Sequence, residues 1–281
     1  MSELKHGMIT PEDMPKVQEI ERDLLRQLDR VCRKYNIHYE IASGTLLGAV
    51  REKGFIPWDD DIDVLMLRGE YEKLVRVCKK EFEGTPYFLQ DSDSDPNYIW
   101  EYAKLRNLDT EYIRFRQEHL RMKTGFFIDI FIFDNLPDNP VLKKIHNGIT
   151  LALRKVSYAR LGSVYEKNAS LRFLYQLLCL IPISFSMGCF KALYKWCNLF
   201  RTKRVTCYGY HTDVFVDGLE RERLTELTRL EFDGDYFMAP RDWDKVLERF
   251  YGPDYMTPPP ESRRNRPNYC YCYSLKREIS Y

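Results

Sequence analysis

The stretch that decides the fold runs from residue 39 to residue 65 and contains two segments, YEIASGTLLG (39–48) and WDDDIDVL (58–65). The pattern predicts a strand, a tight glycine turn, a short helix, an acidic cluster and a second strand. Successive side chains of a strand point to opposite faces, so Asp61 and Asp63 would lie together while the residues between and after them enter a core. Two carboxylates this close repel each other unless a cation or a basic partner lies between them. The stretch therefore predicts a divalent metal site beside a buried strand.

The sequence on either side predicts more helices and strands. Apolar residues recur every three or four positions from 17 to 35, which indicates an amphipathic helix. Residues 69–81 predict another helix, 98–106 and 111–116 predict the two strands of a hairpin, and 125–134 predict an almost wholly apolar strand. Shorter signals predict a strand at 38–42, a helix at 46–53, a strand and turn at 230–240 and a last helix at 241–250. We therefore expect an α+β fold with a mixed sheet flanked by helices.

The apolar strand at 125–134 carries a single acid in its middle, Asp129. An isolated ionised carboxylate is costly in such surroundings, so Asp129 is expected to be protonated, to have a basic partner or to ligate a cation. Asp61, Asp63 and Asp129 thus form a candidate set of catalytic, metal-binding carboxylates. Hard oxygen ligands of this kind select Mg²⁺ or Mn²⁺, whose shell is completed by water and by phosphate oxygens of a substrate.

Other interpretations of these motifs fail on particular positions. The acids from Asp59 onward imitate a calcium loop, but Val64 stands where such a loop needs glycine. The Gly44–Gly48 segment lacks the Gly-Lys-Ser/Thr of a P-loop, there is no GxGxxG, and no Cys/His set has zinc-site spacing. A glycine turn that opens a helix, followed by an acid-x-acid strand and a third acid, indicates metal-assisted transfer at a nucleotide phosphate.

The bulk composition limits the partners and the compartment. There are 43 Lys and Arg against 42 Asp and Glu, a net charge of +1, so no overall field attracts nucleic acid. The eight cysteines show neither CxxC spacing nor a disulfide framework, and the N-terminal segment MSELKHGMIT does not resemble a signal peptide. We expect reduced thiols in a cytoplasmic protein.

The domain organisation follows the change of pattern along the chain. We expect one catalytic unit over 1–281, with a core at 1–138, a helical insertion at 139–205 and a C-terminal segment at 206–281 that completes the site. Residues 173–190 carry no charged side chain but are interrupted by a proline, and basic residues flank them. Solvated or buried helices and a peripheral contact with the inner face of the membrane through 171–204 both stay open.

The motifs together resemble one known family. The segments SGTLLGAVR (43–51) and GFIPWDDDIDV (54–64) closely resemble the signature of the LicD family, bacterial phosphocholine transferases related to the transferase domains of fukutin and fukutin-related protein. The later segments AKLRN (103–107), GFFIDIF (125–131) and YGPDYM (251–256) reinforce the resemblance. One departure is that residues 263–269 lack the histidines that often follow in relatives.

The resemblance implies a nucleotidyltransferase-type fold and a magnesium- or manganese-dependent reaction. Phosphocholine would pass from CDP-choline to a sugar hydroxyl of a cell-surface glycan precursor or a lipid-linked saccharide, with release of CMP. Asp61 and Asp63 would be the strand pair of metal ligands and Asp129 the third. The implied contacts to the donor phosphate or nucleotide are Ser43, Gly44, Thr45, Arg51, Lys104 and Arg106.

Further residues and further functions stay open from the sequence. Asp59 and Asp60 are expected to orient the ligands or to bind loop backbone, and Trp58 to hold the acidic turn in place or to stack on a base. A choline head group would need aromatic faces, for which Trp100, Tyr102, Tyr251 and Tyr255 are candidates. The alternatives are transfer of glycerol or ribitol phosphate from a CDP donor, nucleotidyl transfer with release of pyrophosphate, and a non-enzymatic nucleotide- or glycan-binding scaffold.

Overall fold

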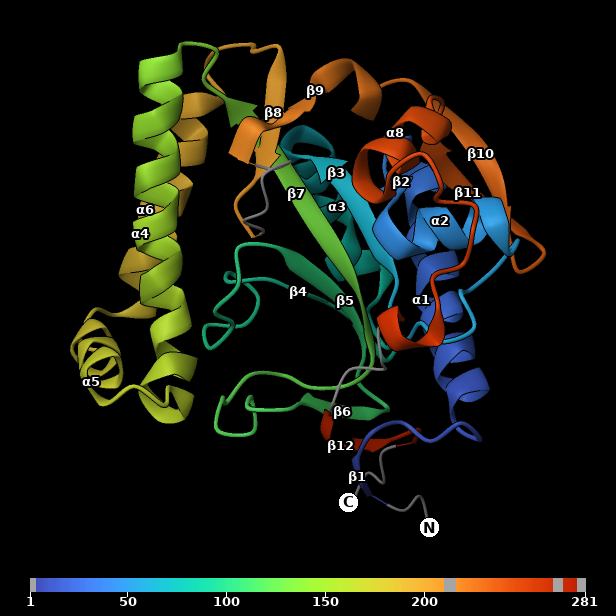
Figure 1. Ribbon diagram of the computed structural model, residues 1–281, viewed down its shortest axis with the longest axis horizontal. Coiled ribbons are helices and arrows are strands. Elements are labelled where there is room, and N and C mark those ends of the chain that lie inside the picture. Colours follow the sequence, from blue (N-terminus) through green and yellow to red (C-terminus); the bar gives the residue numbers. More distant parts are fainter. Residues whose placement is uncertain (1–3, 210–215, 265–269, 277–281) are drawn as a thin grey trace.

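The computed structural model describes residues 4–209, 216–264 and 270–276, and it confirms the α+β fold (Figure 1). Its central sheet is mixed, because β3 and β7 are parallel while the other described pairs are antiparallel. The strand order is β2 (Glu40–Ile41), β3 (Asp63–Leu67), β7 (Phe127–Leu136), β5 (Ala103–Asn107) and β4 (Tyr87–Gln90), with β8 (Arg204–Cys207) on β7 and β9 (Leu219–Glu220) on β8.

One face of this sheet is closed by helices α1 (Met14–Tyr35) and α3 (Arg68–Glu81). Both helices bury their apolar stripes against alternate strand residues such as Val64, Ile130 and Ile132. The helix α1 ends at Asn36, which adopts the left-handed conformation that commonly terminates helices. Since neighbouring strand residues point the opposite way, Asp63 and Asp129 face the other side of the sheet.

The helix α2 (Ser43–Arg51) lies at the edge of the sheet and starts directly after β2. It begins three residues earlier than the sequence predicted, because Ser43 and Gly44 already belong to its first turn. Leu46, Leu47 and Ala49 enter the main core. The start of the helix is therefore held rigidly beside the acid-bearing strand.

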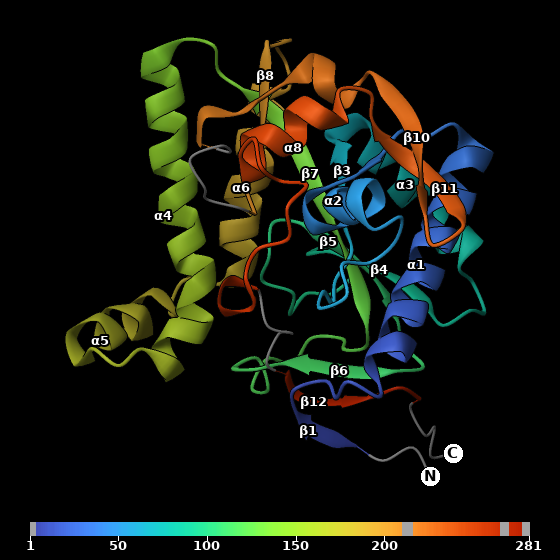
Figure 2. The same ribbon diagram turned by 45° about the vertical axis from the view of Figure 1, so that its right-hand side comes forward.

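The region from α4 to α6 forms a helical layer beside the sheet, on the side away from α1 (Figures 1 and 2). Its helices are α4 (Pro140–Tyr165), α5 (Ala169–Leu178) and α6 (Ile183–Cys197). No single described helix has the length and apolar character to cross a membrane, whereas α5 and α6 would pass together but are bent by 77°. The described part of the segment that the sequence predicted as an insertion is thus largely helical. The proposed domain limits stay a prediction.

The C-terminal part of the chain supplies a hairpin and a helix that lie over the edge of the central sheet away from the α4–α6 layer (Figure 1). It contains η1 (Arg221–Leu224), β10 (Leu227–Phe232), β11 (Asp235–Pro240), α8 (Trp243–Tyr251) and η2 (Glu261–Arg263). The strand and turn predicted at 230–240 and the helix predicted at 241–250 are therefore confirmed.

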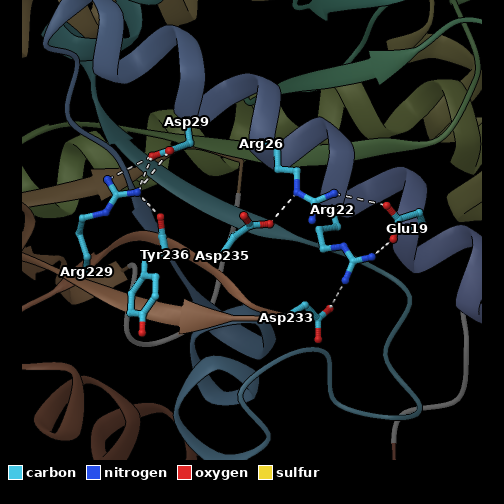
Figure 3. Close-up of polar contacts among 8 residues, drawn as sticks. All are labelled: Glu19, Arg22, Arg26, Asp29, Arg229, Asp233, Asp235 and Tyr236. Carbon is cyan, nitrogen blue, oxygen red and sulfur yellow. Dashed lines mark hydrogen bonds and ion pairs between the residues drawn. The ribbon is translucent and has the colours of Figure 1, made fainter.

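Ion pairs fasten this hairpin to α1 (Figure 3). Arg26 Nε lies 2.6 Å from an Asp235 carboxylate oxygen, and Arg229 Nη2 lies 3.3 Å from one of Asp29. The turn of the hairpin also reaches the loop after α2, where the Asp233 carboxylate fills the space that a side chain at Gly54 would need. The hairpin therefore contacts both α1 and the loop that follows α2.

The predicted hairpin of 98–106 with 111–116 is wrong. The strand β5 has β4 on one edge and β7 on the other, so neither edge is left for β6 (Glu111–Arg114). Instead β6 pairs with β12 (Cys270–Ser274), which pairs in turn with β1 (Lys5–Gly7). The strand β4 was not predicted from the sequence, and it takes the place beside β5 that β6 was expected to occupy.

All eight cysteines are free thiols in the described structure. Several are buried among apolar side chains of the core, such as Cys32 and Cys78. This agrees with the absence of a disulfide framework in the sequence.

Candidate active site

A cavity of about 700 Å³ lies over the acid-bearing side of the sheet, between α2, α8 and η2. It is the place where most of the predicted site residues meet. Those that line it are Ser43, Gly44, Arg51, Trp58, Asp59, Asp61, Asp63, Tyr251 and Tyr255. Segments from both halves of the chain therefore form one site.

The strand register places three titratable residues in one row across the sheet. Asp63 on β3 is paired with Asp129 on β7, and Asp129 is paired with Lys104 on β5. Residues paired across neighbouring strands project from the same face. The Lys104 ammonium donates a hydrogen bond to the Asp129 carboxylate, and both side chains are buried. Of the three states expected for Asp129, the structure thus supplies the basic partner.

A second cation reaches this row from the small sheet. Arg114 on β6 places Nη2 3.8 Å from an Asp129 carboxylate oxygen and 4.0 Å from one of Asp61. Its guanidinium also lies 4.7 Å from the centre of the Phe127 ring. Burial opposes the charge of Arg114, but Asp129 and its other neighbours raise the pKa of the guanidinium above its usual value. The arginine therefore stays charged between the two acids.

The carboxylates of the cavity repel one another, and a bound cation would reduce this repulsion. Burial raises the pKa of Asp63 well above its usual range, and the charges of Asp61 and Asp129 add to the shift. Burial likewise raises the pKa of Asp59 to about 8, with contributions from Asp61 and Asp60. For Asp61, burial raises the pKa while Arg114 opposes the shift. Holding all these groups ionised in the folded protein is costly.

This donor set fits a hard divalent cation in its chemistry. The carboxylates are the oxygen ligands that Mg²⁺ and Mn²⁺ prefer, and two of them, Asp61 and Asp63, line the cavity. Within the described residues, no group of three His, Cys, Asp or Glu side chains is already arranged to hold a metal ion. The Asp129 carboxylate is engaged by Lys104 and Arg114. It would have to exchange these contacts to become a third ligand.

The turn between β2 and α2 holds the acid strand in position. The Thr45 hydroxyl is buried and accepts a hydrogen bond from the backbone N–H of Asp63 at 2.9 Å. Ser43 has a positive φ of 49°, which is strained for a residue other than glycine. The Ser43 side chain acts to lower the pKa of the Asp63 carboxyl group, against the effect of burial. The turn thus holds the backbone of Asp63 and places Ser43 beside its carboxylate.

Gly44 is required by a close approach at the same turn. A Cβ atom added to it would lie 2.5 Å from a carboxylate oxygen of Asp59. The absence of a side chain therefore lets the Asp59 carboxylate rest against the first turn of α2, where the helix dipole favours negative charge.

The structure does not bring every predicted residue to the cavity. Thr45, Lys104 and Arg106 are buried, and the Arg106 guanidinium contacts Gln90 and the carbonyl oxygen of Gly125. Asp60 and Asp129 are also buried and are not part of the cavity wall. Trp100 and Tyr102 line a second cavity of about 290 Å³ on the side of α6. Contacts of these residues with a donor stay predictions.

Other residues of the site were missed from the sequence. Arg114 was not assigned because its place depends on the pairing of β6 with β12. Arg223, Phe250 and Arg263 line the cavity but come from segments without a recognisable motif. Trp58, predicted to support the acidic turn, has the guanidinium of Arg264 4.3 Å from its ring centre.

Comparisons with known proteins show the family of this chain. The family model described as LicD/FKTN/FKRP, nucleotidyltransferase domain, matches residues 36–149, which include the whole acidic stretch and Asp129. The fold and the match together define a chain with a nucleotidyltransferase domain.

The full-length comparison reaches further along the chain. Over 247 residues the chain is 30% identical to the lipopolysaccharide cholinephosphotransferase LicD of Haemophilus influenzae, covering 85% of this chain and 89% of that protein. It is also 28% identical to an uncharacterised protein of Rickettsia prowazekii over 42% of this chain and 50% of that protein. The chain therefore belongs to the LicD family, as its motifs indicated, and it is a transferase.

Proposed function

We propose that this chain transfers phosphocholine from CDP-choline to a sugar hydroxyl of a cell-surface glycan such as lipopolysaccharide, and releases CMP. The observation that carries the proposal is the composition of the cavity wall. The carboxylates of Asp63, at the start of β3, and of Asp61, just before it, line the cavity together with the first turn of α2, Arg51 and Arg263. Carboxylates suit a metal bound to phosphates, while arginines and a helix start suit the phosphates themselves. The relative from Haemophilus influenzae, named for this activity, supports the choice of head group and acceptor.

The chemistry assigns each group a role. The acceptor hydroxyl oxygen forms a bond to the distal phosphorus of the donor, the bond from that phosphorus to the CMP oxygen breaks, and the hydroxyl proton passes to a carboxylate or to water. Asp61 and Asp63 would hold a Mg²⁺ or Mn²⁺ ion, with Asp129 beside them. When bound, this ion would neutralise charge on the phosphates and align the attacking and leaving oxygens.

The protein groups around the acids would orient the donor. Arg51 donates a hydrogen bond to the carbonyl oxygen of Tyr255 at 3.2 Å, so its guanidinium is fixed at the cavity wall. Arg114 and Lys104 hold Asp129 in place. The Thr45 hydroxyl holds the backbone of Asp63. The acids are thus positioned before any substrate arrives, which lowers the cost of reaching the transition state.

A product assay tests the proposal. The protein is incubated with a lipid-linked or lipopolysaccharide acceptor, Mg²⁺ or Mn²⁺, and one of CDP-choline, CDP-glycerol, CDP-ribitol or CTP. We expect CMP and a phosphocholine-modified acceptor from CDP-choline, and loss of both products after addition of EDTA. If CMP is released only from CDP-glycerol or CDP-ribitol, the transferred group is a polyol phosphate rather than phosphocholine. Release of pyrophosphate from CTP would indicate nucleotidyl transfer, and thermal stability unchanged by any of the nucleotides would favour a non-enzymatic scaffold.

We also propose that α5 and α6 rest on an anionic membrane surface, which would bring a lipid-linked acceptor to the cavity. Large apolar side chains are exposed there, among them Phe173, Leu180 and Phe185, which are 61%, 78% and 63% exposed. The neighbouring positions Lys167 and Lys195 are exposed as well. Apolar side chains flanked by exposed cations are typical of helices that lie in an anionic lipid surface.

Vesicle flotation tests the membrane proposal. We expect the protein to bind vesicles containing phosphatidylglycerol more strongly than vesicles of phosphatidylcholine alone. The triple variant Phe173→Ser, Leu180→Ser, Phe185→Ser should lose this binding but keep its melting temperature, because these side chains contribute little to the core. A matched variant with Tyr236→Ser, which is exposed on the distant β10–β11 hairpin, should bind as the wild type does. Equal recovery of the triple variant with the anionic vesicles would contradict the proposal.

A further inference from the structure

The cavity wall contains a buried carboxylate that the reaction above does not use. Glu40 on β2 is only 4% exposed, lines the cavity, and its Oε2 atom has no hydrogen-bond partner among the described residues. Buried carboxylates are normally hydrogen-bonded or paired, because burial without a partner costs free energy. A group in this state requires an explanation.

The strand register places Glu40 next to the acid row. Glu40 pairs with Leu65 on β3, and Leu65 pairs with Phe131 on β7. This row lies two residues along the strands from the row that contains Asp63 and Asp129, so both rows project from the same face. Two residues of a strand span about 7 Å. The row that contains Glu40 therefore lies about 7 Å along the strands from the row of acids.

The surroundings of Glu40 are apolar rather than polar. Leu65, Phe131, Leu219 and Phe250 line the same cavity and belong to one apolar cluster. Arg223 also lines the cavity, but its Nε lies 3.5 Å from the Glu220 carboxylate. Burial raises the pKa of Glu40 well above its usual range. The pocket end beside Glu40 thus combines aromatic faces, aliphatic side chains and one uncompensated acid.

These features match the chemistry of a quaternary ammonium group. Such a cation has no N–H to donate, so hydrogen-bond acceptors cannot recognise it specifically. Aromatic faces and a nearby carboxylate bind it instead, and burial of its methyl groups adds an apolar contribution. A hydroxylated polyol head group would require several hydrogen-bonding groups at this end, and the side chains there supply few.

We propose that Glu40, with Phe131 and Phe250, binds the trimethylammonium group of the donor. This inference rests on the proposed function and extends it, since it assigns the choice of head group to one end of the cavity. A cation beside Glu40 favours its ionised form, so the carboxyl group releases its proton when the head group binds, and the phenylalanines act by their ring faces. The set differs from the aromatic residues that the sequence suggested, of which Trp100 and Tyr102 line the other cavity.

Calorimetric titration of the full chain, with Mn²⁺ and without acceptor, tests the inference. CDP, CDP-choline and CDP-glycerol are titrated into the wild type and into Glu40→Gln. We expect the ratio of CDP-choline to CDP affinity to fall at least tenfold in Glu40→Gln, while the ratio of CDP-glycerol to CDP affinity does not change. Glutamine has nearly the same shape, so a loss of charge rather than of volume is measured.

Two further variants keep the result interpretable. Glu21→Gln removes another buried carboxylate whose Oε2 has no partner but which does not line the cavity, and it should leave the CDP-choline to CDP ratio unchanged. Phe131→Leu keeps an apolar side chain and removes the ring, and it should lower the ratio severalfold even if Glu40→Gln folds poorly.

The outcomes separate the inference from the proposed function. If the wild type prefers CDP-choline to CDP, and neither Glu40→Gln nor Phe131→Leu changes that preference, the inference fails and the proposed function stands. If the wild type binds no CDP compound, the proposed function fails and the inference with it. A preference for CDP-glycerol over CDP-choline in the wild type would overturn the assignment of this end to a cation.

Discussion

Replacing Asp63 with asparagine is expected to lower kcat by about 10³-fold, which corresponds to about 4 kcal/mol of lost transition-state stabilisation. Asparagine keeps the shape of the side chain and leaves the backbone hydrogen bond from residue 63 to the Thr45 hydroxyl in place, but it removes the charge proposed to hold the metal. Steady-state CMP release with saturating Mn²⁺ and CDP-choline measures the effect. Asp61→Asn should behave in the same way, because its carboxylate lines the same cavity.

The Asp63→Asn substitution that lowers kcat should not lower the stability of the metal-free protein. The pKa of Asp63 is raised in the folded protein above its value of about 4 in the unfolded chain. When the pH rises above the unfolded value, this carboxyl group ionises more easily in the unfolded chain, so the metal-free protein loses stability. Asparagine removes this loss, and the metal-free variant should melt at or above the wild-type temperature at neutral pH. Asp93→Asn, at an exposed position, serves as the control and should keep full activity. Full activity of Asp63→Asn in a well-folded protein would contradict its assignment as a ligand.

The largest expected loss of stability comes from Asp134, which lies on the same strand as Asp129 but away from the chemistry. Its two carboxylate oxygens accept hydrogen bonds from Arg68 at 2.9 and 2.7 Å, and one also accepts from Asn198 at 2.7 Å. The Arg68 guanidinium in turn lies 3.9 Å from the centre of the Tyr194 ring on α6. Asp134→Ala would leave this arginine unpaired in a largely buried place. We expect a loss of about 3–5 kcal/mol in the free energy of unfolding.

Urea unfolding at pH 7 measures the change, and a double variant separates its cause. Arg68→Met together with Asp134→Leu removes both charges, so it should recover a large part of the stability that Asp134→Ala loses. Native Asp134→Ala protein, assayed well below its midpoint, should retain the affinity for CDP-choline, because Asp134 does not line the cavity. A loss below about 1 kcal/mol would mean that the ion pair is effectively solvated, as exposed pairs are.

The parts of the fold that the sequence predicted correctly have strong local signals. The strand β7 was evident because its apolar run is uninterrupted except for Asp129, and β3 was evident from the alternation after Asp61. Helix α1 was evident from its periodic stripe. In each case the pattern lies within the element itself, so the strand or helix could be predicted without knowing which other elements it packs against.

The features that sequence reasoning missed depend on partners far apart in the chain. Lys104 was expected to contact a phosphate, and its pairing with Asp129 follows only from the register of β5 against β7. A lone cation on a strand has the same pattern whether it faces a substrate or an acid. Arg114 depends on the pairing of β6 with β12, and Glu40 depends on the row that it shares with Leu65. These long-range contacts decide the electrostatics of the site.

The small sheet of β1, β6 and β12 has a consequence for how the enzyme matures on the ribosome. Arg114 lies on β6, which pairs with β12. The residues of β12 are synthesised long after those of the acid row. The strands of the central sheet lie within residues 40–220, whereas β12 begins at Cys270, so we expect the sheet to fold before Arg114 is fastened near Asp61 and Asp129. We therefore expect a fusion or truncation that disturbs β12 to act on Asp61 and Asp129 from the opposite end of the sequence.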